Sequence, residues 1–225
     1  SRCACLGKSC MDELKIKRKF NLQKGRIDMY VNRYKVSSPK LLYPIMKNFD
    51  ILNFCNEINF KNLYKKKYKF IIMDSFSELV DSKFILSDNS VFFGVKRDIN
   101  HEKLRKINGI YQKQLKLNEL KKLYNLGFEN LNKAFDCNIY FILYPQKFEV
   151  NEYYKKRGKK IKEILKELSL KLNYLKIIEI EDKKVYKAKE DDFPYHFDSK
   201  TIRTFSKKIF DTLSETDKEF INNFS

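Results

Sequence analysis

Phe70-Ile-Ile-Met73, followed at once by Asp74, is the clearest of five short apolar runs in the sequence, and it decides the fold. Longer segments whose apolar residues recur with helical spacing separate these runs. Strands that alternate with helices predict a mostly parallel sheet with helices on both faces. The other runs are residues 3–6, 27–31, 139–144 and 175–180, and the clearest helical patterns are residues 101–135, 151–172 and 199–224.

We expect these elements to form one α/β domain over residues 1–225, a three-layer sandwich with a five-stranded, flavodoxin-like sheet of strand order 2-1-3-4-5. Ligands of such sheets bind at the carboxyl ends of the strands, beside strand one. That rule points to residues 7–10 and to Asp74. Two interpretations of Asp74 stay open: it positions substrate or orients Arg33, or it caps the following turn.

Composition and charge narrow the class of protein. The 225 residues include 47 Lys and Arg against 29 Asp and Glu, a net charge of +18. Most of the excess is lysine beside glutamate in helical patterns, so we expect nucleic-acid binding to be weak and non-specific if it occurs. Binding to an acidic substrate or an anionic membrane surface stays open. The sequence has no run of about 18 apolar residues, so no transmembrane segment is expected.

The cysteines indicate reduced thiols and a cytoplasmic protein. Their number, five, is odd, and a chain of this size can fold without disulfides. The first ten residues also lack the long apolar stretch of a secretion signal. Cys3, Cys5 and Cys10 lack the second short-spaced pair that a zinc site requires, so we expect no metal.

Gly7-Lys8-Ser9 suggests a candidate nucleophile. A phosphate-binding loop would need a glycine five places before Gly7, where Arg2 stands, so that function is excluded. A glycine allows a tight turn after a strand, and the N-terminus of the next helix can stabilise an oxyanion, so Ser9 is a candidate nucleophile. The alternative is an ordinary N-cap serine. Cys10, which is expected to ionise easily beside a helix N-terminus and Lys8, could take the place of Ser9.

Serine chemistry needs a base, and the sequence has only two histidines, His101 and His196. His101 lies among charges at an expected helix start, which is typical of a surface residue. His196 lies in the loop before the last helix, shortly after Asp191 and Asp192, and a nearby carboxylate can set the tautomer of an imidazole. The alternative is a surface histidine beside acidic residues.

These motifs resemble the SGNH (GDSL-like) hydrolase superfamily. Leu6-Gly-Lys-Ser9 is similar to its Leu-Gly-Asp-Ser block, and residues 192–196 are similar to its final Asp-x-x-His block. Gly-Lys-Ser-Cys at residues 7–10 and Pro194-Tyr-His-Phe197 resemble more specifically a divergent branch that is associated with surface polysaccharide.

The resemblance implies an ester hydrolase or acyl transferase that acts on a small-molecule or carbohydrate ester without a cofactor. Ser9 would be the nucleophile and His196 the general base, oriented by Asp192 or Asp191. Lys8 stands where the superfamily has Asp, and its oxyanion-hole Asn and Gly have no clear match here. These departures favour an alternative of another class, a catalytically silent SGNH-like module that binds an anionic polymer or nucleic acid.

Overall fold

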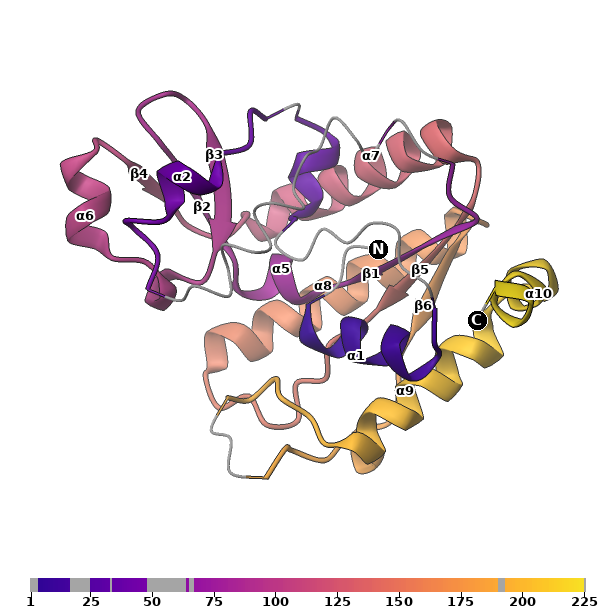
Figure 1. Ribbon diagram of the computed structural model, residues 1–225. Helices are drawn as coiled ribbons and strands as arrows, with labels where there is room; N and C mark the ends of the chain where they lie inside the picture. The colour runs from indigo at the N-terminus through magenta and orange to yellow at the C-terminus, as the bar shows by residue number, and fades with distance from the viewer. Residues whose placement is uncertain are drawn as a thin grey trace.

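The computed structural model describes residues 4–16, 25–32, 34–47, 64, 67–189 and 193–224. At its centre lies a parallel sheet of three strands in the order β1-β5-β6 (Figure 1). β1 (Phe70–Asp74) pairs with β5 (Asn138–Ile142), which in turn pairs with β6 (Leu175–Ile178). The last four residues of β1 and of β5 are buried, as strands covered on both faces must be. The predicted α/β class is confirmed.

Helices cover both faces of this sheet (Figure 1). α1 (Cys5–Glu13) packs on α9 (Ser199–Thr212) at one face, and α7 (Leu117–Phe135) packs on α8 (Glu152–Lys171) at the other. α8 forms because its buried apolar residues recur at helical spacing and because Asn151 caps its first turn by accepting a 2.9 Å hydrogen bond from the N–H of Tyr153. Asp198 caps α9 in the same way, through the N–H of Thr201 at 2.8 Å.

A second, antiparallel sheet with the order β3-β2-β4 lies beside the first. It consists of β2 (Ser82–Ile85), β3 (Val91–Gly94) and β4 (Ile110–Gln112), and α5 (Phe76–Val80) links it to β1. It has its own apolar core, to which α2 (Pro39–Leu42) and α6 (His101–Lys106) contribute. The remaining elements are α10 (Glu215–Phe224) and the short 3-10 helices η1 (Ile27–Tyr30), η2 (Lys96–Asp98) and η3 (Asp182–Lys184).

The predicted five-stranded sheet is wrong. The expected first strand, residues 3–6, runs into α1 from Cys5 onward, and Cys3 lies outside the described residues. The spacing of the buried Leu6, Cys10 and Met11 suits a helix face, and side chains rather than a neighbouring strand accept the N–H groups at its start.

The expected second strand, residues 27–31, is the 3-10 helix η1. Arg26 and Asp28 form a bidentate ion pair with N–O distances of 3.0 and 2.7 Å, which holds the chain in a tight turn. The carboxylate of Glu78 accepts the N–H of Ile27 at 2.6 Å, so this group is not available for a sheet.

Two of the expected long helices are interrupted. The pattern over residues 101–135 is divided into α6, β4 and α7, because Asn108 adopts a left-handed conformation (φ 52°) and Ile110–Gln112 pair with β2. The pattern over residues 199–224 is divided into α9 and α10. No helix in the described ranges combines the length and the apolar character that crossing a membrane requires.

Candidate functional site

Asp74, the last residue of β1, holds two helix starts at the carboxyl end of the parallel sheet. Its carboxylate accepts a 2.6 Å hydrogen bond from the N–H of Ala4, the N-cap of α1, and a 3.1 Å bond from the N–H of Phe76 in α5. The residue is 2% exposed. These contacts support the capping role for Asp74. Arg33, its other predicted partner, lies outside the described residues.

Tyr144 joins the start of α1 to the loop that carries His196. Its hydroxyl accepts a 2.8 Å hydrogen bond from the N–H of Leu6. The rings of Tyr195 and Phe197, on either side of His196, pack against the Tyr144 ring with centroids 6.0 and 6.1 Å away. Tyr144 follows β5, the central strand, so the two ends of the chain that carry the predicted site meet at the carboxyl end of the sheet.

Ser9 lies in the second turn of α1, so its predicted position directly after a strand is wrong. Its side chain is half-buried. Gly7 is buried within the same helix and makes no strand-to-helix turn. Ser9 follows Leu6 by three positions, which is about 4.5 Å along a helix axis. Within the described ranges, no hydrogen bond joins the Ser9 hydroxyl to His196.

His196 lies in the predicted place, in the loop before α9. Its carbonyl accepts the N–H of Ala188 at 3.0 Å, and its N–H donates to the carbonyl of Phe193 at 3.2 Å. The half-buried imidazole stands edge-on to the ring of Phe193, with the centroids 4.8 Å apart. Asp191 and Asp192, which were predicted to orient the imidazole, lie outside the described residues.

A buried hydrogen bond anchors the His196 loop to the chain that follows β5. The hydroxyl of Tyr195 donates to the carboxylate of Glu149 at 2.5 Å. Burial, and after it this hydrogen bond, raises the pKa of Tyr195, so the phenol keeps its proton at neutral pH. The backbone next to His196 is therefore firmly placed.

Cys10 is not the easily ionised thiol that the sequence predicts. It is fully buried between α1 and α9, with its Sγ 3.7 Å from the carbonyl oxygen of Ile202. Burial raises the pKa of the thiol to about 12. The expected easy ionisation is wrong, because α1 turns this side chain into the core and away from solvent.

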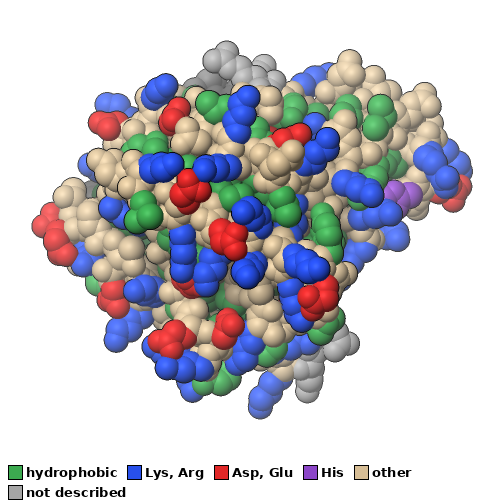
Figure 2. Space-filling view, turned by 180° about the vertical axis from the view of Figure 1, so that it is seen from behind, with side chains coloured by type: hydrophobic (Ala, Val, Ile, Leu, Met, Phe, Trp, Pro, Cys, Tyr) green, Lys and Arg blue, Asp and Glu red, His purple; other side chains and the backbone are tan. Residues whose placement is uncertain are grey.

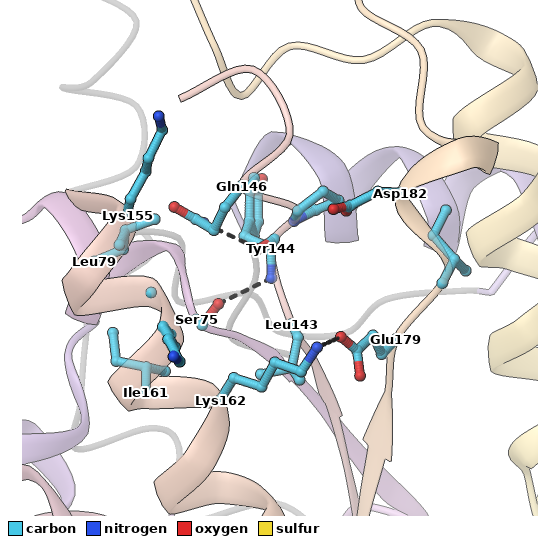
Figure 3. Close-up of a pocket in the computed structure, with 14 residues that line it drawn as sticks. Ser75, Leu79, Leu143, Tyr144, Gln146, Lys155, Ile161, Lys162, Glu179 and Asp182 are labelled. Atoms are coloured by element: carbon cyan, nitrogen blue, oxygen red, sulfur yellow. Dashed lines mark hydrogen bonds and ion pairs between the residues drawn. The ribbon is translucent and has the colours of Figure 1, made fainter. Parts of the chain in front are cut away.

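A pocket of about 210 Å³ opens where all three parallel strands end (Figure 3). The N–H of Tyr144 donates to the hydroxyl of Ser75 at 3.0 Å on one side, and Lys162 and Glu179 form an ion pair on the other (Figure 3). Burial opposes the charge of Glu179, but the nearby ammonium groups of Lys162 and Lys166 lower its pKa. This ion pair was not predicted from the sequence. The rule that ligands bind at the carboxyl ends of strands points to it when it is applied also to the runs at residues 139–144 and 175–180.

Basic side chains are spread over the surface rather than gathered in one place on the face that Figure 2 shows. Several are paired with acids, as lysines beside glutamates in helical patterns predict. Glu167 accepts Lys121 at 2.6 Å and Lys171 at 3.1 Å, for example. Exposed pairs of this kind contribute little to stability but keep the surface solvated.

Among the described residues, no three His, Cys, Asp or Glu side chains lie close enough together to hold a metal ion. No family model, curated protein or solved structure matches this chain. Its function has to be inferred from its own residues.

Proposed function

We propose that the chain is an ester hydrolase or acyl transferase of the SGNH type that acts on an acylated carbohydrate or a similar small ester. The observation that carries the proposal is the shared contact with Tyr144, which brings the Ser9 helix and the His196 loop to the carboxyl end of a parallel sheet. Active sites of α/β proteins lie at that end.

In the proposed reaction, the Ser9 hydroxyl attacks the acyl carbonyl and passes its proton to His196. The alcohol then leaves with that proton, and water or an acceptor hydroxyl takes the acyl group from Ser9. Asp192, or Asp191, would orient the imidazole. Asp74 and Tyr144 already accept the N–H groups of Ala4 and Leu6 at the start of α1, so other donors would have to stabilise the oxyanion.

A fluorophosphonate probe tests this proposal without knowledge of the natural ester. An activated serine displaces fluoride from phosphorus and becomes a stable phosphonyl ester, which mass spectrometry maps to one peptide. We expect labelling at Ser9 that is abolished in Ser9→Ala and falls at least a hundredfold in His196→Ala. Ser169→Ala, a half-buried serine of α8, is the matched control and should leave the labelling unchanged.

The position of Ser9 inside a helix favours a second candidate of another class, a catalytically silent module that binds an anionic ligand. The same experiment separates the two. A folded chain that stays unlabelled is not a serine hydrolase, and the binding module then replaces it. Equal labelling of Ser9→Ala would exclude Ser9 as the nucleophile and overturn the proposed site.

A further inference from the structure

Arg157, on α8, is a buried cation whose hydrogen bonding is incomplete. It is 2% exposed, and its guanidinium donates to the carbonyl oxygens of Glu78 and Leu115, both at 2.7 Å. Its Nη2 is also buried and has no hydrogen-bond partner in the described part of the chain. An unsatisfied donor on a buried charged group is costly, so this guanidinium has the capacity to bind one more acceptor.

Arg157 lines a cleft of about 820 Å³, a volume typical of small-molecule sites. The cleft lies between η1, the antiparallel sheet and the starts of α7 and α8. Its lining includes five cations and two acids, and one of the acids, Asp28, is already neutralised by Arg26. Besides Arg26 and Arg157, the cations of the lining are Lys83, Lys113 and Lys116.

The start of α7 adds to this positive charge. The helix has 19 residues, and its first turn, from Leu117 to Glu119, lines the cleft. Its N-cap is Lys116, which forms no side-chain capping bond. A lysine at the N-cap is unfavourable for an isolated helix, because the partial positive charge of the N-terminus repels the ammonium group. An anion bound between the ammonium group and the N-terminus would reverse that effect.

Lys83 lines the same cleft beside Tyr34. Its Nζ lies 5.0 Å from the centroid of the Tyr34 ring and 3.4 Å from the Tyr34 hydroxyl. Burial lowers the pKa of this lysine, while the nearby Asp28 raises it by more than Arg26 lowers it. A bound anion would favour its charged form.

We propose that this cleft binds the phosphate group of a small phosphate monoester through Arg157, Lys83 and the N-terminus of α7. Tyr34 and Tyr153, which also line the cleft, would contact the organic part of the ligand. Ser9 and His196 are not among the lining residues, so this proposal is independent of the proposed ester chemistry.

Isothermal titration at constant ionic strength tests the site. Inorganic phosphate, a hexose monophosphate and a nucleoside monophosphate serve as probes, each ester beside its dephosphorylated form. We expect at least one monoester to bind, and its dephosphorylated form to bind at least tenfold more weakly. Lys83→Gln and Lys116→Gln should each raise the Kd at least fivefold, because each removes a charge that faces the phosphate.

Lys176→Gln makes the same charge change on the exposed edge of β6, away from the cleft, and should alter the Kd less than twofold. Ser9→Ala should bind as the wild type does. Arg157→Lys keeps the charge but loses the fixed geometry of the guanidinium. It should weaken binding more than Lys83→Gln and Lys116→Gln do, and circular dichroism verifies that the variant is folded. Three outcomes would overturn the site. The dephosphorylated forms bind as tightly as the monoesters, Lys176→Gln raises the Kd as much as Lys83→Gln and Lys116→Gln do, or no probe binds at concentrations up to about 10 mM.

Discussion

The hydroxyl of Tyr144 accepts a 2.8 Å hydrogen bond from the backbone N–H of Leu6. Tyr144→Phe leaves this buried donor unsatisfied, so we expect the free energy of unfolding to fall by about 1 to 2 kcal/mol in urea titration. If Ser9 is the nucleophile, fluorophosphonate labelling should also fall, because α1 loses a tether three residues before it.

Tyr186→Phe is the matched control for that change. This residue is 39% exposed, and its ring contacts with Lys147 and Lys200 survive the loss of the hydroxyl. We expect a stability change below about 0.5 kcal/mol. Similar effects of the two substitutions would mean that the bond to Leu6 contributes nothing specific.

Local sequence patterns were sufficient to predict β1, β5, β6 and α8. Each of these elements has an apolar run or an apolar helix face that is long enough to identify it without knowledge of its neighbours. They failed at residues 3–6, where a four-residue apolar run suits a strand or a buried helix equally. Contacts with Asp74 and Tyr144, distant in sequence, decide that case. The same limit hid the Arg157 cleft, since its walls come from four separate parts of the chain.

Cys10 provides a direct test of burial. With a pKa of about 12, about one thiol in ten thousand is ionised at pH 8. We expect iodoacetamide to modify the exposed Cys5 of the native protein at pH 8 and to reach Cys10 only after denaturation. Peptide mapping by mass spectrometry measures both sites in one sample. Rapid native modification of Cys10 would show that α1 does not hold it in the core.

Gly127 lies where α7 packs tightly against η1. A Cβ added there would lie 2.7 Å from Cδ1 and 2.9 Å from Cγ1 of Ile27, which is fully buried. Gly127→Ala gains helix propensity of about 1 kcal/mol, but we expect the overpacking to exceed it and the protein to lose about 1 kcal/mol of stability.

Two further variants check the cause of that loss. Ile27→Val in the Gly127→Ala background should restore part of the stability, a coupling that a double-mutant cycle measures. Gly158→Ala is the matched helix glycine, because its new Cβ would meet the side chain of Gln146 instead, with Cδ at 2.7 Å. That side chain can shift if it gives up its 3.0 Å hydrogen bond to the carbonyl of Tyr144, so the loss of stability should be smaller than for Gly127→Ala. Additive effects of the first two changes would contradict the packing argument.

Tyr140 makes stability sensitive to alkaline pH. Its buried hydroxyl donates to Asp217 at 2.6 Å and accepts the N–H of Ser214 at 3.0 Å. Burial, followed by the bond to Asp217, raises its pKa to about 12. The unfolded chain releases this proton near pH 10 and the folded chain only near pH 12. The stabilisation is therefore complete below about pH 10 and is lost as the pH rises toward 12.

Urea unfolding at pH 8, 9, 10 and 11 measures this effect. We expect the wild type to lose stability steadily above pH 10. Tyr140→Phe should be less stable at pH 8, because Asp217 loses one of its hydrogen bonds and the Ser214 N–H loses its acceptor, but its decline above pH 10 should be shallower. Some decline should remain, since burial also raises the pKa of Tyr34 to about 12. Equal slopes in the two proteins would show that Tyr140 releases its proton at the same pH whether the chain is folded or unfolded.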